Sequence, residues 1–468
     1  MNEVVKILLV VYDNESFIHT FPLGLAYIAA VLKKQKYQVC IYNQDLHHYL
    51  PEHLTNYLDT HYYDIVGLNI IGGYWQYKKL LEISEAINKS KNRKDFKYII
   101  GGHGVSPEPT YFLYKTHSDM IVIGEGETTI LEVIEALKGN CGLRNVLGIA
   151  YREGNEVFIN PRRPLIQDID SIPFPAWDLF PITYYRLLRY VNMEPIDFII
   201  PVLSGRGCPF SCNFCYRLDE GYRPRKSEAI IDEIKLLKEK YRINVIDFSD
   251  ELLMVSEQRV IELCLAFLKT NLNIKWHCNG RLNFATKEVL YLMKKAGCIF
   301  INYGIEAMDD EVLKNMHKGL IIDQIIKGVE NTLEIGISPG LNIIWGNLGD
   351  TEETLKKGVD FLLKYDKCVQ MRTIRFCTPY PGCELYYYAI KKGLLKDCAD
   401  FYENKHKNSD LLSVNFMDIS DEEAYEALFQ ANKVLITNYY QKKLHLIIND
   451  AQNLYINKNV NFRGFRTF

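Results

Sequence analysis

Residues 204–217 read SGRGCPFSCNFCYR, so that Cys208, Cys212 and Cys215 follow one another with the spacing C-x3-C-x2-C. The loop comes directly after Phe198–Leu203, an apolar stretch that is typical of a buried strand. Three thiolates within one short loop can converge on a single metal centre. An ordinary [4Fe–4S] cluster takes four cysteines. Because only three are local here, the loop predicts a cluster with one iron left open for another ligand.

Two other interpretations of the cysteine loop are open at this point. A structural zinc site usually has four protein ligands, and the fourth would have to come from far along the chain, from Cys264, His277 or Cys278. Alternatively, the three cysteines are small buried residues without a ligand role. The density of cysteines in the loop favours the cluster over both alternatives.

The chain around the loop alternates apolar strands with amphipathic helices. Strands are expected at Phe198–Leu203, Val245–Ser249, Ile274–Asn279, Phe300–Ile305, Leu341–Trp345 and Met371–Phe376. Six such units predict a partial (β/α)6 barrel of the TIM type over residues 197–385, with its active site at the carboxyl ends of the strands. Residues 386–468 are expected to form a helical C-terminal region.

Residues 1–145 show a second alternation, with strands expected at Val5–Val11, Gln38–Asn43, Asp64–Ile70, Tyr98–Gly101 and Met120–Ile123. This pattern predicts an α/β domain with a doubly wound, Rossmann-like parallel sheet, whose ligands lie at the carboxyl ends of the strands. No G-x-G-x-x-G follows the first strand, which disfavours a dinucleotide. Residues 146–196 are expected to form a β-hairpin and a Pro-rich linker between the two domains.

Composition narrows the class of protein further. The chain has 468 residues and a formal net charge of −3, which argues against a nucleic-acid partner. Its twelve cysteines are spread along the chain without a targeting signal, which favours reduced thiols and a cytoplasmic location. No apolar run is long enough for a membrane span.

The cysteine loop and the barrel pattern together resemble the radical S-adenosylmethionine (SAM) superfamily. That resemblance implies that SAM binds the open iron of the [4Fe–4S] cluster and that Phe214, directly before the third cysteine, packs near the adenine. It also implies SAM contacts at the ends of the second, third and fourth barrel strands, from Asp250, Glu251, Arg281 and Glu306. Two features depart from the family pattern: the turn at residues 345–354 lacks its usual proline, and Cys383 stands where Thr or Ser is common.

The N-terminal domain resembles the cobalamin-binding domain of the B12-binding radical SAM subfamily. Glycines lie at the expected ends of its strands and at the start of its first helix, where they let a ligand approach the backbone. The resemblance implies cobalamin contacts from Leu23, Gly24, Gly101, Gly102, His103, Gly124, Glu125, Gly126 and Glu127. The D-x-H-x-x-G motif that supplies an axial histidine elsewhere is absent, and His19 is out of register. The alternative is a related domain that holds no cobalamin.

The resemblance implies a methyltransferase that acts on an unactivated carbon, or phosphorus, of a small-molecule, lipid or peptide substrate. A flavodoxin or ferredoxin would be the reductant. Two alternatives are kept: a cobalamin-dependent radical cyclase or rearrangement enzyme that transfers no methyl group, and a non-catalytic cobalamin or Fe–S sensor. A tRNA methylthiotransferase is disfavoured, because only Cys40 and Cys141 precede the loop and they lie too far apart for a second cluster.

Overall fold

A mixed sheet organises the N-terminal part of the chain in the computed structural model, which describes residues 4–15, 21–217 and 220–461. Within these residues its seven strands have the order β2-β1-β3-β4-β5-β6-β7. The first five are parallel and match the expected strands closely. Their bounds are β1 Lys6–Val11, β2 Gln38–Asn43, β3 Ile65–Asn69, β4 Lys97–Gly101 and β5 Met120–Val122.

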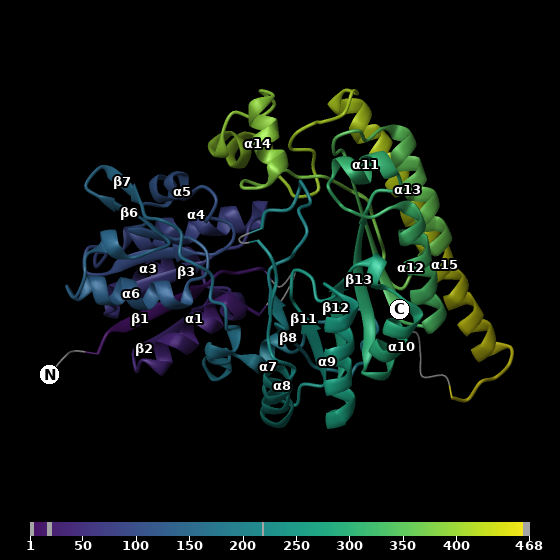
Figure 1. Ribbon diagram of the computed structural model, residues 1–468, viewed down its shortest axis with the longest axis horizontal. Helices are drawn as coiled ribbons and strands as arrows, with labels where there is room; N and C mark the ends of the chain where they lie inside the picture. Colours follow the sequence, from purple (N-terminus) through teal and green to yellow (C-terminus); the bar gives the residue numbers. More distant parts are fainter. Residues whose placement is uncertain (1–3, 16–20, 218–219, 462–468) are drawn as a thin grey trace.

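Helices cover both faces of this sheet, as the doubly wound pattern predicts (Figure 1). One face packs against α1 (Leu23–Lys34) and α6 (Glu127–Leu137). The other packs against α3 (Pro51–Thr60), α4 (Tyr74–Lys89) and α5 (Pro109–Thr116), while the short α2 (Gln44–His47) follows β2. The side chains of β1 alternate between the two cores, because successive residues of a strand point to opposite faces.

The expected hairpin belongs to this sheet instead of standing apart in the linker. Strands β6 (Ile149–Glu153) and β7 (Glu156–Ile159) continue the sheet, with β6 antiparallel to β5. The Pro-rich stretch that follows crosses to the barrel through short 3-10 turns and α7 (Ile182–Tyr185). It is anchored at the start of α1, where the ring of Phe21 lies 4.8 Å from that of Trp177 and 5.3 Å from that of Phe180.

The second sheet has six parallel strands in the described part of the chain, in the order β15-β14-β13-β12-β11-β8. This is the predicted partial barrel, with bounds β8 Ile199–Val202, β11 Val245–Phe248, β12 Lys275–Gly280, β13 Cys298–Glu306, β14 Ser338–Trp345 and β15 Arg375–Phe376. Its outer side carries α8 Ser227–Tyr241, α9 Glu257–Thr270, α10 Lys287–Lys295, α11 Asp310–Asn315, α12 Ile322–Ile335 and α13 Glu352–Tyr365. Strand β15 is shorter than the expected strand Met371–Phe376, since only Arg375 and Phe376 pair with β14.

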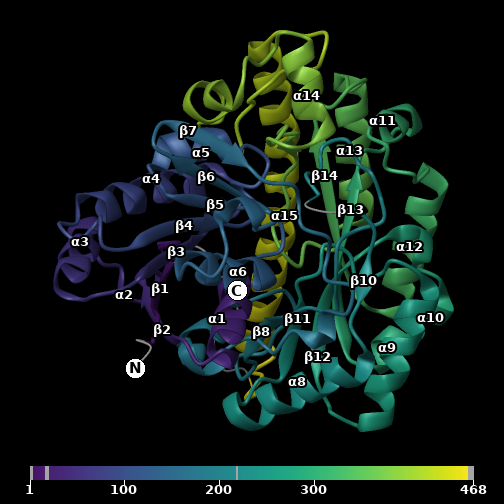
Figure 2. The ribbon, with the colours of Figure 1, turned by 60° about the vertical axis from the view of Figure 1, so that its left-hand side comes forward.

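The cysteine loop is framed by a separate two-stranded ribbon. Strand β9 (Gly205–Arg206) precedes the loop and pairs antiparallel with β10 (Arg223–Pro224), which follows it. Arg206 and Arg223 are direct partners in this pairing. The ribbon contacts the N-terminal domain, because Arg206 and Arg223 pair with Glu125. The barrel and the N-terminal sheet stand side by side in two views (Figure 2).

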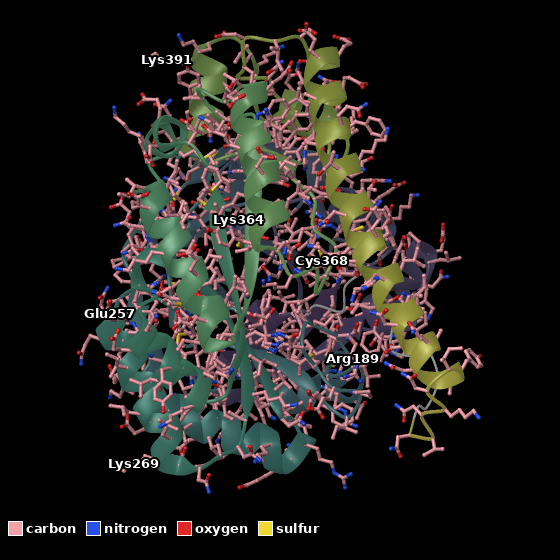
Figure 3. All side chains as sticks on the ribbon, turned by 90° about the vertical axis from the view of Figure 1, so that its right-hand side faces the viewer. Arg189, Glu257, Lys269, Lys364, Cys368 and Lys391 are labelled. Carbon is pink, nitrogen blue, oxygen red and sulfur yellow. The ribbon has the colours of Figure 1, made fainter. Side chains whose placement is uncertain are left out.

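The C-terminal region is helical, as expected, and it spans both halves of the molecule. The helix α14 (Glu384–Lys391) and a π-helical segment (Asp400–Lys405) contact the N-terminal domain, where the Glu403 carboxylate accepts hydrogen bonds from Tyr111 and Lys115 at 2.9 and 2.7 Å. The last helix, α15 (Asp421–Tyr455), runs along α13 on the outside of the barrel (Figure 3). No helix in the described ranges is both long enough and apolar enough to span a bilayer.

Candidate active site

A cavity of about 510 Å³ lies between the two sheets. From the N-terminal domain it is lined by all of the residues expected to contact cobalamin: Leu23, Gly24, Gly101, Gly102, His103, Gly124, Glu125, Gly126 and Glu127. From the barrel side it is lined by the ribbon and by the loop after β11, including Gly205, Arg206, Gly207, Arg223, Asp250 and Glu251. The fold therefore places the predicted cobalamin contacts and two of the predicted SAM contacts around one space.

The cavity reaches into the N-terminal domain between the sheet and helices α1 and α6. Leu9, Val122 and Ile130 line this apolar part. It lies where β1 stands between β2 and β3, the point at which the strand order of a doubly wound sheet reverses and ligands usually bind. An apolar slot at this point suits the insertion of an elongated ligand along the sheet.

Two glycines around the cavity, Gly124 and Gly102, are needed for different reasons. A side chain at Gly124 (φ +85°) would start in open space, since no atom lies within 4 Å of an added Cβ. A ligand can therefore approach the backbone there. Gly102 (φ +105°) is required by local packing instead, because an added Cβ would collide with the Asn69 side chain and the Ile70 backbone.

Four charged residues that line the cavity join the two domains, and we refer to them as the arginine–glutamate clamp. Arg206 contacts Glu125 at 2.8 Å and Glu127 at 2.5 Å, and Arg223 contacts Glu125 at 2.9 Å. Burial favours the neutral form of Glu125, but the neighbouring Arg206 and Arg223 bring its net pKa below the usual range. The two glutamates expected to contact cobalamin thus also hold the ribbon beside the cysteine loop.

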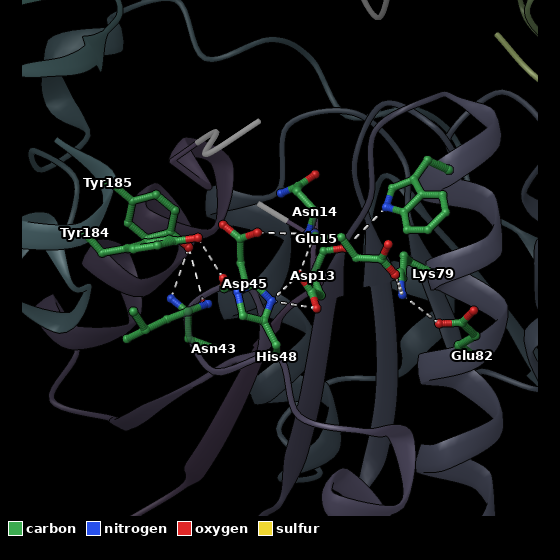
Figure 4. A network of polar contacts seen from close by, with 12 residues as sticks. Asp13, Asn14, Glu15, Asn43, Asp45, His48, Lys79, Glu82, Tyr184 and Tyr185 are labelled. Atoms are coloured by element: carbon green, nitrogen blue, oxygen red, sulfur yellow. Dashed lines mark hydrogen bonds and ion pairs between the residues drawn. The ribbon is translucent and has the colours of Figure 1, made fainter. Parts of the chain in front are cut away.

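The loop after β1 is occupied by polar contacts of its own (Figure 4). Asp13 pairs with His48 at 3.0 Å, and Glu15 pairs with Lys79 at 3.1 Å. The backbone N–H of Asn14 donates to the Asp45 carboxylate at 2.8 Å. These contacts fix the loop where other B12 proteins carry the D-x-H-x-x-G motif; His19 lies outside the described residues.

His103 stands at the edge of the cavity nearest the cysteine loop. Its ring centroid lies 4.5 Å from that of Tyr216, the residue after Cys215. Burial lowers the pKa of His103, so its imidazole is neutral at physiological pH. A neutral ring in contact with the loop can accept or donate one hydrogen bond toward the cavity.

The cysteine loop follows the first barrel strand, β8, as predicted, although the short strand β9 comes between them. Cys208 and Cys212 are half-buried and Cys215 is exposed. The N–H of Cys215 donates to the Cys212 carbonyl at 3.1 Å. A hydrogen bond from the Cys215 thiol, followed by the charge of Lys318, lowers the pKa of Cys212 and favours the thiolate that binds metals. In the described chain no three potential ligands converge on a point as one metal ion would require. Three soft thiol donors in one loop fit the larger [4Fe–4S] cluster, whose binding would draw them together.

Asn213, between the second and third cysteines, holds the loop against the barrel. Its side chain exchanges two hydrogen bonds with the side chain of Asn347, at 2.9 and 3.1 Å, and donates a third to the Asn315 carbonyl at 2.9 Å. Both amides are buried, with 2% and 0% of Asn213 and Asn347 exposed. No sequence pattern indicates this pair, because the two residues are 134 positions apart.

The predicted SAM contacts lie around the same end of the barrel. Asp250 is buried and accepts hydrogen bonds from the Ser204 N–H, at 2.7 Å, and from the Ser204 hydroxyl. Burial raises the pKa of Asp250 to about 6. Asp250 therefore ties β8 to β11, and the adjacent Glu251 is the more exposed of the two carboxylates at the cavity.

Arg281 and Glu306 lie next to the cysteine loop. The guanidinium of Arg281 lies 3.6 Å from the ring centroid of Phe210 and donates to the carbonyls of Lys318 and Gly319. Its Nε is buried without a hydrogen-bond partner among the described residues. An unpaired buried donor is unusual and leaves Arg281 able to bind an acceptor.

Glu306 has an unusual backbone conformation for a strand residue. Its φ is +70°, and the pairing of β13 with β14 shifts at this point. Its carboxylate pairs with Lys318 at 2.8 Å. An added Cβ at Gly304 would collide with this carboxylate, so the glycine is needed to admit it. Strained residues at strand ends are typical of functional sites, and Lys318 joins the site through its ion pair with Glu306.

Phe214 lies between the two halves of the molecule. Its half-buried ring packs against both hydrophobic cores.

Cys377 and Cys383, which follow β15, are both buried, and Cys383 Sγ accepts from the N–H of Tyr386 at the start of α14. A helix-capping role explains why a cysteine can replace the Thr or Ser that is common at this position.

Comparison with known proteins identifies both halves. Residues 12–134 match the family model of the B12 binding domain, and residues 202–362 match that of the radical SAM superfamily. An uncharacterized methyltransferase of Pyrococcus horikoshii is 30% identical over 404 residues, which cover 84% of this chain and 85% of the relative. The anaerobic magnesium-protoporphyrin IX monomethyl ester cyclase of Rubrivivax gelatinosus is 28% identical over 78% of this chain and 65% of its own length.

Solved structures share the fold. The radical SAM methyltransferase TsrM from Kitasatospora setae, with cobalamin and a [4Fe–4S] cluster bound, superposes with a TM-score of 0.69 at 17% identity, covering 83% of this chain and 78% of that chain. The protein belongs to the B12-binding radical SAM enzymes. Its cofactors are accordingly a [4Fe–4S] cluster, SAM and cobalamin.

Proposed function

We propose that the protein is a cobalamin-dependent radical SAM methyltransferase acting on an unactivated carbon, or phosphorus, of a small-molecule, lipid or peptide substrate. The observation that carries this proposal is a cavity bounded by both domains. A methyl group can pass between two cofactors and a substrate only if all three share one enclosed space. The predicted cobalamin contacts line that space together with two of the five predicted SAM contacts, Asp250 and Glu251.

When bound, the cluster and SAM would supply a 5′-deoxyadenosyl radical, and cobalamin would supply the methyl group. The chain contributes binding and orientation. We expect Cys208, Cys212 and Cys215 to hold the cluster.

The SAM contacts are proposed from the polar groups around the loop. Arg281, with its unpaired Nε, is suited to a carboxylate, which a guanidinium binds strongly. Glu251 and Glu306 are suited to an ammonium group, and Phe214 to the adenine. Asp250 acts indirectly, since its carboxylate is already taken by Ser204.

The clamp closes the space around the reaction. Arg206 and Arg223 bridge the ribbon to Glu125 and Glu127 on the cavity wall. A reactive radical needs exclusion of water, and a charged seam between domains keeps the cavity walls together.

We further propose a flavodoxin or ferredoxin as the reductant and a cytoplasmic location.

A second candidate is a cyclase or rearrangement enzyme that moves no methyl group. It is supported by the 28% identity with a cyclase over 78% of the chain. The two candidates differ in one product, because only methyl transfer converts SAM to S-adenosylhomocysteine.

The test is to measure SAM products from anaerobically reconstituted, reduced protein supplied with cobalamin. The proposal predicts both S-adenosylhomocysteine and 5′-deoxyadenosine, and neither above background from the Cys212→Ala variant. Formation of 5′-deoxyadenosine alone, with a substrate that is consumed, would favour the cyclase instead.

A further inference from the structure

A second hollow lies beside the main cavity, and we call it the tyrosine pocket. It has a volume of about 230 Å³. Three tyrosines form much of its wall, and they come from distant parts of the chain: Tyr216 follows the cysteine loop, Tyr380 follows β15, and Tyr402 lies in the π-helical segment. The loops after β3 and β4 complete the pocket with Ile71, Gly72, His103 and Gly104, together with Pro381.

The position of this pocket relates it to both cofactor sites. His103 lines the main cavity as well as the tyrosine pocket. Tyr216, which contacts the His103 ring, is adjacent in sequence to Cys215. A molecule in the pocket is therefore next to the cobalamin side of the cavity and to the loop that holds the cluster. A substrate of the proposed reaction has to meet the same two conditions.

The pocket wall is uncharged. No Asp, Glu, Lys or Arg is among its lining residues. Its histidine is neutral, because burial lowers the pKa of His103. A charged ligand would lose its hydration there without gaining an ionic partner, and such burial is costly. The wall thus selects against ions.

The aromatic side chains are held in place by further rings. Tyr402 stacks on Tyr77 with centroids 4.6 Å apart and planes 19° apart. Tyr380 packs edge-on against His406 and Phe401, at 5.2 and 5.9 Å. Rings that are fixed before a ligand arrives bind another ring with little loss of freedom. Ile71, 47% exposed, lies at the side of the pocket that opens to solvent.

We propose that the tyrosine pocket binds an uncharged planar ring, which is the recognition group of the substrate. That the ring belongs to the substrate rests on the proposed function, but binding of the ring can be measured without turnover. Three tyrosine side chains, an aliphatic edge and the absence of ionised groups all suit a neutral aromatic or heteroaromatic ring.

Gly72 offers a variant that fills the pocket without straining the backbone. An added Cβ there would lie 3.7 Å from Cδ1 of Tyr380, an ordinary contact, and its φ is outside the left-handed region. Gly72→Val should therefore occupy part of the pocket. Gly142→Val is the matched control, because Gly142 is exposed, extended (φ −86°, ψ 147°) and has no atom within 4 Å of an added Cβ.

The experiment is equilibrium dialysis of the full-length, cofactor-reconstituted protein without SAM, using indole as the neutral ring and benzoate and tetramethylammonium as charged probes. We expect indole to bind wild type and Gly142→Val equally and to bind Gly72→Val at least tenfold more weakly, with neither ion binding measurably. No indole binding to wild type, or equal binding to Gly72→Val, would overturn the proposal. Tetramethylammonium bound more tightly than indole would overturn the neutral class and indicate a cation-binding aromatic cage.

This readout separates the two proposals. Because dialysis involves no SAM cleavage, pocket-specific indole binding stands whether or not methyl transfer occurs. Loss of S-adenosylhomocysteine formation with intact indole binding would count against the methyltransferase alone.

Discussion

Replacing Asn213 by Leu should loosen the cysteine loop by an amount that its contacts allow us to bound. The change removes three side-chain hydrogen bonds, takes the Asn213 donor from the Asn315 carbonyl, and leaves the Asn347 amide nitrogen with only a weak bond to Cys377 Sγ at 3.6 Å. Each buried polar group left unsatisfied costs about 1–3 kcal/mol. Asn347 keeps a hydrogen bond from Leu348 N–H at 2.7 Å. We therefore expect the free energy of unfolding to fall by about 2–4 kcal/mol.

The reciprocal geometry makes a sharper prediction for the double variant. Asn347→Leu removes the very amide that Asn213→Leu leaves unsatisfied, so the second substitution should add little. In urea unfolding followed by tryptophan fluorescence, the double variant should cost less than the sum of the singles by about 1–3 kcal/mol. Additive costs would refute the idea that the two amides act as one unit.

A buried asparagine elsewhere in the barrel provides the control. Asn331 is 9% exposed and donates to the Ala285 carbonyl at 3.0 Å, without sharing a partner with the pair. Combined with Asn347→Leu, Asn331→Leu should give additive losses. Cluster absorbance under a chelator should also decay faster in Asn213→Leu than in Asn331→Leu, because only the former alters the loop.

Three further predictions follow from the site. Arg206→Met should increase hydrogen exchange in the ribbon and reduce coupling between SAM cleavage and methyl transfer several-fold, while Arg206→Lys should retain part of both; unchanged exchange in the Met variant would exclude a clamp. Cys212→Ala should abolish cluster absorbance and SAM cleavage, and retained cleavage would contradict the cluster assignment. The folded-state pKa of Asp250, about 6, lies above its unfolded value, so wild type loses stability as the pH rises from the unfolded to the folded pKa. Asp250→Asn removes this loss, so its gain in thermal stability over wild type should be larger at pH 8 than at pH 5. An equal effect at both pH values would show that Asp250 does not titrate in this range.

The strands and the cysteine loop could be predicted because their signals are local. Stretches such as Gln38–Asn43 and Val245–Phe248 are short, apolar and bounded by turns or helical patterns, and the structure places strands there. The spacing of the cysteines likewise reflects the reach of one loop. Glycines at strand ends were informative because the carboxyl ends of parallel strands meet at one edge of a sheet.

What the sequence could not give was the pairing of distant polar groups. Arg206 and Glu125 are 81 positions apart, and neither belongs to a pattern that specifies its partner. The hairpin at β6 and β7 was recognisable, but its docking on β5 depends on a free sheet edge that appears only in the folded domain. Neighbouring carboxylates raise a similar difficulty. Asp250 and Glu251 are adjacent in sequence, and only the fold shows that Asp250 is buried against Ser204.

The central claim is that the cavity between the two sheets holds cobalamin beside the SAM site. It is tested most directly by the visible spectrum and cobalamin content of the full-length protein, compared with those of a Gly101→Leu variant. Gly101 lines the cavity, and an added Cβ would lie 3.5 Å from Cβ of Val122, so the longer side chain should narrow the cavity without breaking the sheet. We expect about one cobalamin per wild-type chain, and at least a tenfold loss of cobalamin in the variant with the cluster absorbance unchanged. A wild-type protein that retains no cobalamin, or a variant that retains it fully, would contradict the account.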